Sequence, residues 1–418
     1  MSDKEGNLLY FSNGCSVINS NQQILINGEG LNPGNLANYW CSGNRGYYVL
    51  SQSIINLPFN NDLNKYGMFH LGGIEIPGLS NARINACYYS EIDISIDNGR
   101  GALLKKNVPI VADTLGGFIK AVKHADGISW WILTAGRMNK LYHRFKFKDG
   151  LIEGPYVQQV EDTCKNPNIT GQAVFSPDGS KYAHFDPWTG LIIYDFDRQS
   201  GLLSKKEKID FWYDPNLDYY YGGISFSPNG RFLYLSIEKN LYQYDLTQLP
   251  IRNSRLFIDT IDGFSSPFLI TFLYHELAPD GKIYISSGNS VNTWGVINNP
   301  DEQGLLCNFK QHSFKLATLN FWCIPNFPNY RLGPLVSTEN MDSKNYTLTF
   351  NNSENFFSYE SFYKPGLVRL FDLNGVQVLY RKINPSYPIV KINHLLNGIY
   401  FVSLEVEGKS YWCKIIKL

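Results

Sequence analysis

The chain has 418 residues, more than a single hydrophobic core usually serves, so we expect two folding units. Lys and Arg together number 37, as do Asp and Glu, and the zero formal charge argues against nucleic-acid or anionic-membrane binding. Aromatic residues make up 15% of the chain, and 36 glycines accompany them, which is typical of an all-β protein with many tight turns. No apolar run is long enough for a transmembrane segment.

The first 115 residues carry two weak copies of one pattern, a turn glycine followed by an apolar strand. One copy occupies residues 3–25, and the other occupies residues 60–71 and continues at residues 86–95. We expect the insertion between them, residues 72–85, to be a loop. The first copy has no upstream strand, so we expect either that residues are missing before Met1 or that a C-terminal segment supplies the strand.

Stronger copies follow in "HADGISWWIL", "FSPDGSKYAHF", "FSPNGRFLYLS" and "LAPDGKIYISS". Their glycines are Gly127, Gly179, Gly230 and Gly281, at intervals of 179 − 127 = 52, 230 − 179 = 51 and 281 − 230 = 51. In residues 171–209, "AVFS", "SKYAHF", "LIIYDFD" and "LLSKKEKI" each read as one short strand. Four short strands per repeat are typical of a β-propeller blade. Residues 315–333, together with N-terminal residues, could complete a seventh unit, so we predict a six- or seven-bladed β-propeller over residues 1–335.

The turn-plus-strand pattern resembles the YVTN and surface-layer type of propeller repeat. A kelch repeat is disfavoured, because Gly222 and Gly223 precede a strand where the kelch glycines would close one. The resemblance is good over residues 120–335 and loose over residues 1–115. It implies a fold and carries no information about a ligand.

The blade pattern stops near residue 335, and residues 336–345 form a polar segment that we predict to be a linker. The strands predicted beyond it span residues 346–350, 367–375, 376–383, 388–395, 398–408 and 410–418. They alternate apolar and polar side chains and are separated by Gly-containing turns. We therefore predict a small antiparallel β-sandwich over residues 346–418.

This C-terminal segment resembles the type A sorting domain of the bacterial type IX secretion system. The resemblance rests on "LFDLNG" at residues 370–375, on L-x-x-G-x-Y, and on a terminal K-x-x-K. It implies a sorting signal, for which the matching residues are Gly398, Tyr400, Gly408, Lys414 and Lys417. The Tyr-Pro-Asn-Pro opening of that family is absent, so we expect the first part of the domain to be atypical. The alternative is an immunoglobulin-like terminal domain with no sorting role.

The resemblance further implies that the type IX secretion machinery is a partner and that the protein is secreted or held at the cell surface. It also implies a signal peptide, and the N-terminal sequence "MSDKEGNLLYFSNG" shows none. We therefore expect that the sequence is truncated at its N-terminus or that a leader has been removed.

The loop "DFWYDPNLDYYYGG" is the best candidate for ligand binding. Trp212, Tyr213, Tyr219 and Tyr220 could stack on a sugar or pack on a partner protein. The alternative, which we favour, is that these rings seal neighbouring blades. The same loop opens like a calcium loop at Asp214, Asn216 and Asp218. The glycine and the glutamate that would complete a calcium loop are replaced by Tyr219 and Ser225, so an Asx turn is expected and no metal.

Acidic pairs could serve glycoside hydrolysis, which needs two converging carboxyl groups. Asp93 and Asp97 are predicted to share one strand face, and Asp195 and Asp197 form a second pair. Asp195 recurs as Asp245 in the next repeat, which favours a structural role. The seven histidines stand singly, and the seven cysteines include no C-x-x-C pair, so no zinc site is expected and the disulfide pairing stays open.

No nucleophile-elbow or phosphate-loop motif is present, so we predict no catalytic residue and no cofactor. The sequence favours a secreted or surface-attached propeller that binds a protein or a glycan. One alternative is a surface hydrolase acting on glycans, with acidic residues at the mouth of the propeller channel. Another is a purely structural or adhesive module.

Overall fold

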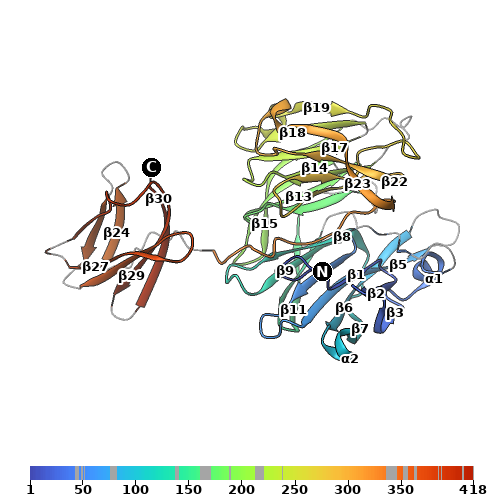
Figure 1. Cartoon of the computed structure of the whole chain (residues 1–418), viewed down its shortest axis with the longest axis horizontal. Helices are drawn as coiled ribbons and strands as arrows, with labels where there is room; N and C mark the ends of the chain where they lie inside the picture. Colours follow the sequence, from blue (N-terminus) through green and yellow to red (C-terminus); the bar gives the residue numbers. More distant parts are fainter. Residues whose placement is uncertain are drawn as a thin grey trace. The chain divides into compact units, whose positions relative to one another are not determined.

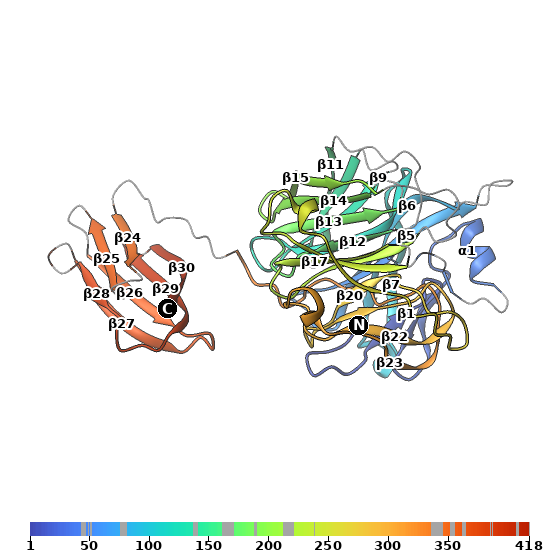
Figure 2. The same ribbon diagram turned by 90° about the horizontal axis from the view of Figure 1, so that it is seen from above.

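The structure is a computed structural model that describes residues 1–42, 47, 48, 50, 52–75, 82–136, 141–160, 171–187, 190–211, 221–237, 239–335, 346–351, 356–361, 365–384, 386, 388–406 and 409–417. The chain divides into two compact units, Met1–Pro334 and Leu335–Leu418 (Figure 1). Strands dominate both units (Figures 1 and 2). The described helices are short, and none is long and apolar enough to cross a membrane. They are α1 (Asn35–Trp40), α2 (Ile96–Gly99), η2 (Ile251–Ser254) and η3 (Gly304–Cys307).

Five successive sets of four antiparallel strands make up most of the first unit. In each set the strands pair in chain order, so the first strand lies at one edge, and the first strands of consecutive sets contact one another. The sets are β4 (Ile54–Pro58), β5 (Lys65–Glu75), β6 (Ala82–Asp93) and β7 (Ala102–Val111); β8 (Leu115–Lys123), β9 (Trp130–Gly136), β10 (Leu141–Lys148) and β11 (Leu151–Gln159); β12 (Gln172–Phe175), β13 (Lys181–Asp186), β14 (Gly190–Asp197) and β15 (Leu202–Ile209); β16 (Gly222–Phe226), β17 (Phe232–Ile237), β18 (Asn240–Asp245) and β19 (Leu256–Thr260); and β20 (His275–Leu277), β21 (Ile283–Ile285), β22 (Val291–Ile297) and β23 (Phe309–Asn320).

A three-stranded antiparallel sheet precedes these sets, formed by β1 (Tyr10–Ser12), β2 (Ser16–Asn19) and β3 (Ile24–Glu29). Its inner face packs on the β4–β7 sheet, where Val17 and Leu25 join a core with Met68 and Leu103. Single residue pairs join β3 to β7 and β6 to β8, so strands β1–β11 are hydrogen-bonded into one continuous sheet. With the first three strands counted as one unit, the described residues form six blade-like units, and the prediction of an all-β propeller is confirmed.

The repeat glycines occupy equivalent turns between the first and second strands of four blades. Gly127, Gly179, Gly230 and Gly281 have φ values of 70°, 72°, 71° and 80°, in the left-handed region that glycine tolerates best. Each donates its N–H to the carbonyl three residues earlier, at 2.8–3.0 Å. We call the end of the propeller that carries these turns, and the connections between third and fourth strands, the turn end. The opposite end, with the connections between blades and between second and third strands, is the loop end.

Neighbouring blades pack face to face through aromatic and aliphatic cores. Between the β8–β11 and β12–β15 blades, for example, the Tyr142 ring lies 5.8 Å from Tyr182 and 5.9 Å from Tyr194, both in edge-on geometry. A second core joins Phe185 and Ile193 to Ile224 and Leu235 of the next blade. Because each strand alternates its side chains, both faces of an inner blade bury apolar residues, which explains the aromatic-rich repeats.

Two expectations about the early blades are wrong. Residues 72–75 and 82–85 are strand and not loop, because β5 continues to Glu75 and β6 begins at Ala82, while residues 76–81 lie outside the described residues. Asp97 does not share a strand face with Asp93, because β6 ends at Asp93 and Asp97 lies within the tight turn of α2 with a positive φ of 54°. The two carboxylates therefore do not form a pair on one strand.

After β23 the chain forms no further strand in the first unit. Residues 321–334, which we call the strap, begin at the loop end, where Trp322 Nε1 donates to the Gly288 carbonyl. They finish at the turn end, where Asn329 Nδ2 donates to Pro177 O at 2.8 Å and Gly333 O accepts from Arg198. The strap therefore runs along the first strands of the blades from one end of the propeller to the other, and residues 315–333 do not build a seventh blade.

The second unit contains two antiparallel sheets that enclose one core, as the β-sandwich prediction requires. Val368, Val402 and Leu404 of one sheet meet Phe357 and Val390 of the other in this core. A strand at residues 356–361 was missed by the sequence pattern. The sheets are β24 (Tyr346–Asn351), β25 (Phe356–Ser361) and β28 (Ile389–Lys391), and β27 (Gln377–Ile383), β26 (Gly366–Phe371), β29 (Gly398–Val406) and β30 (Lys409–Lys417).

Candidate functional site

The predicted ligand residues Trp212, Tyr213, Tyr219 and Tyr220 lie outside the described residues, as do Asp214, Asn216 and Asp218. The two flanking aromatic residues are described. Phe211 packs into the core between two blades, with its ring 6.1 Å from that of Phe185. Tyr221 lies at the loop end, 5.6 Å from the Trp322 ring. The two described ends of this loop therefore lie in different places, with Phe211 in a core between two blades and Tyr221 beside the strap.

Six aromatic rings from three distant segments form a continuous row at the loop end. We call Tyr39, Trp40, Tyr47, Phe321, Trp322 and Tyr221 the aromatic row. Their successive ring centroids lie 5.6, 5.5, 6.2, 6.1 and 5.6 Å apart. Most of these rings meet at steep angles, so neighbours hold one another in place. Tyr39 is 45% and Phe321 41% exposed, so the row presents apolar ring surface to solvent.

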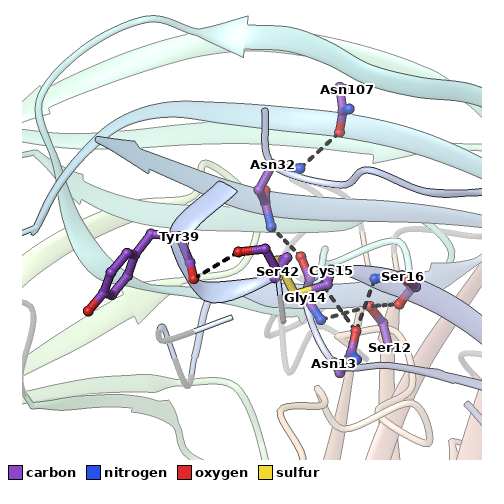
Figure 3. Close-up of a disulfide and its surroundings, with 10 residues drawn as sticks. Ser12, Asn13, Gly14, Cys15, Ser16, Asn32, Tyr39, Ser42 and Asn107 are labelled. Atoms are coloured by element: carbon purple, nitrogen blue, oxygen red, sulfur yellow. Dashed lines mark hydrogen bonds between the residues drawn. A yellow bond between two sulfur atoms is a disulfide. The ribbon is translucent and has the colours of Figure 1, made fainter. Parts of the chain in front are cut away.

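The position of the first two rings is fixed by a disulfide. Cys41, which caps α1 directly after Trp40, is bonded to Cys15 in the turn between β1 and β2 of the first sheet. Figure 3 shows how hydrogen bonds hold both sides of this link. Asn32 Nδ2 donates to Gly14 O at 3.0 Å, and Ser42 Oγ reaches the Tyr39 carbonyl at 3.5 Å. The disulfide and its polar surroundings thus anchor the helix that carries the exposed Tyr39.

Glycine allows the close approaches on which the row depends. At Gly288 a Cβ atom would lie 3.0 Å from the Tyr221 ring, closer than side chains normally pack. At Gly14 the φ of 82° disfavours any side chain, and a Cβ atom would clash with Tyr48. The Tyr221 end of the row is therefore packed closely against a glycine, and Gly14 makes room for Tyr48, the residue after Tyr47 of the row.

Beneath the row, the strap ties the first strands of two blades together. The Asn326 amide donates to Ile54 O of β4 at 2.9 Å and to Ile119 O of β8 at 3.0 Å. The Tyr330 hydroxyl donates to Asn56 O at 2.8 Å, and its ring lies 5.8 Å from Trp130. Since the first strand of a blade has one unpaired edge, these donors satisfy carbonyl groups that would otherwise need water.

One buried ion pair links two of the first strands. Lys120 Nζ of β8 lies 3.6 Å from Glu276 Oε2 of β20, and their side chains are only 5% and 11% exposed. Burial raises the pKa of the Glu276 carboxyl to about 7, although the Lys120 ammonium opposes the change. The charge beside Glu276 is thus a lysine, whereas glycoside hydrolysis uses a second carboxyl group.

The other acidic candidates make structural contacts. Asp195 pairs across the sheet with Lys181 at 3.4 Å, and its counterpart Asp245 binds Arg231 at 2.7 Å. Asp93 accepts from the backbone N–H of Ser95 at 2.9 Å. Among the described residues, no group of three or more His, Cys, Asp or Glu side chains could hold a metal ion.

Three of the five sorting-motif residues converge on one turn of the second unit. β29 begins at Gly398, the Tyr400 hydroxyl donates to Leu396 O at 2.7 Å, and Lys417 Nζ donates to Leu395 O at 2.7 Å. This convergence could not be predicted from the sequence, because the acceptors are backbone carbonyl groups, which every residue has. Gly408 lies outside the described residues, and the backbone of Lys414 pairs with Phe401 in register.

The aromatic row was also missed, because its three segments lie 100 residues or more apart in the chain. The adjacent aromatic pairs Tyr39-Trp40 and Phe321-Trp322 were the available signal.

Comparisons with known proteins support no family assignment. No family model matches the sequence. A search of curated protein sequences gave no match. Solved structures with similar folds include a candidate 6-phosphogluconolactonase from Bacteroides uniformis, with a TM-score of 0.40 at 15% identity over 80% of this chain and 88% of that chain. The periplasmic gluconolactonase of Pseudomonas aeruginosa has a TM-score of 0.39 at 12% identity over 92% of this chain and 97% of its own. These similarities concern the fold alone.

Proposed function

We propose that this protein is a binding module of an oxidising, extracytoplasmic compartment, and that the aromatic row contacts its protein or glycan ligand. The observation that carries the proposal is the exposure of Tyr39 and Phe321 in a row of rings anchored on two sides. Exposed aromatic rings held in fixed positions bind sugar faces and apolar side chains at low entropic cost. The Cys15–Cys41 disulfide supports the compartment, because such bonds persist outside the reducing cytosol.

The row is tested by screening the purified full chain on glycan arrays and in protein pull-downs. We expect a ligand that the double variant Tyr39→Ala/Phe321→Ala binds at least tenfold more weakly. Phe257→Ala is the matched control, because Phe257 is also an exposed ring, 56% accessible, but lies on the outermost strand β19. If Phe257→Ala weakens ligand binding as much as the double variant does, or if the double variant binds as tightly as the native chain, the aromatic row is not the ligand site.

Export through the C-terminal unit is the second part of the proposal, and the convergence of Gly398, Tyr400 and Lys417 on one turn supports it. In a bacterium with the type IX machinery, deleting residues 398–418 should leave the propeller in the periplasm. Because this deletion removes β29 and β30, two of the four strands of one sheet, Lys417→Met serves as a milder variant and Lys382→Met on β27 as its control. Unchanged surface display of the deletion would refute the sorting role.

The hydrolase alternative stays a prediction. Its sharpest test is Glu276→Gln, since Glu276 is a buried carboxyl group whose pKa burial raises to about 7. Glycan cleavage by the native chain that this variant abolishes would favour an enzyme over a binding module.

A further inference from the structure

The turn end of the last blade exposes two adjacent leucines on an ordered element. Leu305 and Leu306 of η3 are 78% and 70% exposed, whereas the next residue, Cys307, is fully buried. Single exposed aliphatic side chains are ordinary, whereas adjacent exposed apolar side chains that form a patch beside a groove mark a candidate interaction surface.

Buried polar side chains of the preceding blade hold this element in place. The Tyr234 hydroxyl donates to Pro300 O at 2.9 Å. Gln243 Nε2 donates to Glu302 O at 2.7 Å, while Gln243 Oε1 accepts from Gly304 N at 2.8 Å. Tyr234 and Gln243 are 0% and 1% exposed. Buried hydrogen bonds of this kind fix the two leucines toward solvent before any partner arrives, which lowers the entropic cost of binding.

A groove of about 580 Å³ lies beside these leucines. The turns of two blades, at Pro228 and Gly281, form part of its lining, together with Asn299, Asp301, Glu302 and Leu306. Its volume falls in the range of sites that accept a few side chains of a ligand. At Gly281, where a Cβ atom would meet no atom within 4 Å, the lining leaves open space.

The groove combines aliphatic and acidic groups. Asp301 and Glu302 are both exposed, and Asp301 Oδ1 accepts from Asn229 N at 2.9 Å. A carboxylate has further acceptor positions, so it can also receive an incoming ammonium or guanidinium group. Two carboxylates in the lining disfavour the anionic headgroups of a membrane surface.

We propose that this surface, Leu305, Leu306 and the adjoining groove, docks a segment of a partner protein in which Lys or Arg stands next to an aliphatic residue. The aliphatic side chain covers the two leucines, and the cation meets Asp301 and Glu302. The site is independent of the aromatic row, because the groove lies at the turn end and the row at the loop end.

The test starts from a displayed library of random 12-residue peptides selected on the immobilised full chain. We expect enriched peptides with Lys or Arg within two positions of Leu, Ile or Val. Peptides synthesised from these sequences should bind the native chain and lose at least tenfold in affinity with Leu305→Ser/Leu306→Ser. They should also weaken at high salt and with Asp301→Asn/Glu302→Gln. Leu63→Ser is the matched control, because Leu63 is 71% exposed in another blade, and it should change nothing.

The remaining outcomes would overturn the proposal. These are enrichment of peptides without a cation, binding that survives loss of both leucines, or no peptide that depends on them. Self-association abolished by Leu305→Ser/Leu306→Ser in sedimentation velocity would assign the surface to a second copy of the chain. Leucine-dependent binding to phosphatidylglycerol vesicles would assign it to a membrane. Because both leucines are exposed, the variants should keep the native melting temperature, which circular dichroism checks.

Discussion

At the residue scale, single side chains in the interior join strands that are far apart in the sequence. Asn326 donates to two first strands, and Lys120 and Glu276 join β8 to β20. Buried polar groups of this kind stabilise the chain only while they remain paired. When one partner is removed, the other stays buried without a hydrogen bond or an opposite charge, and its desolvation then destabilises the fold. The stability of the propeller should therefore respond to these residues more strongly than to its surface charges.

Glu276 should make the stability depend on pH. Its carboxyl pKa is raised from 4.5 to about 7, so the folded chain binds this proton more tightly than the unfolded chain. The free energy of unfolding should therefore fall as pH rises from about 4.5 to about 7, by about 3 kcal/mol in total. Urea titrations at several pH values across this range should show that the free energy of unfolding of Glu276→Gln lacks this fall. If the free energy of unfolding falls equally with pH in the native chain and in the variant, the pH dependence does not come from Glu276.

Asn326→Ala should destabilise the propeller by about 1–3 kcal/mol, because it removes the donor from two strand carbonyls. Asn329→Ala is the control, since Asn329 is exposed and bonds a turn carbonyl at the end of the strap. Its loss should be smaller, within about 1 kcal/mol. Denaturant unfolding followed by tryptophan fluorescence measures both, and equal losses would show that the strap is not held at Asn326.

At the element scale, the strap and the disulfide perform the same task at different places. The strap crosses the first strands of the blades, and the disulfide ties α1 to the first sheet. Each positions part of the aromatic row. The strap carries Phe321 and Trp322, and the disulfide holds α1, which carries Tyr39 and Trp40. The ligand site that we propose therefore depends on elements with little regular secondary structure of their own.

The double variant Cys15→Ala/Cys41→Ala should lose about 3 kcal/mol of stability, because the bond closes a loop across a separation of 26 residues. Thermal unfolding with and without reductant measures this loss, and reductant should lower the melting temperature of the native chain alone. Since α1 carries Tyr39, the variant should also weaken ligand binding. A variant with native stability would show that the bond does not form or constrains nothing.

At the scale of the whole molecule, the sequence was most informative where structure is local and repeated. The interval between Gly127, Gly179, Gly230 and Gly281 located four turns, because each of these turns uses a left-handed φ that glycine tolerates best. The strap, the disulfide and the aromatic row could not be predicted, because they depend on contacts between segments that no periodicity relates. The same holds for the carbonyl acceptors of Tyr400 and Lys417, which have no side-chain signature.

The proposed role of the loop end is tested most directly by amide hydrogen exchange of the full chain with and without the ligand found in the screens. We expect slower exchange around α1, at residues 286–290 and at residues 321–324, which lie at the loop end. The turns that contain Gly179, Gly230 and Gly281 should be unaffected. Protection confined to those turns, with none around α1 or the start of the strap, would contradict a ligand site on the aromatic row.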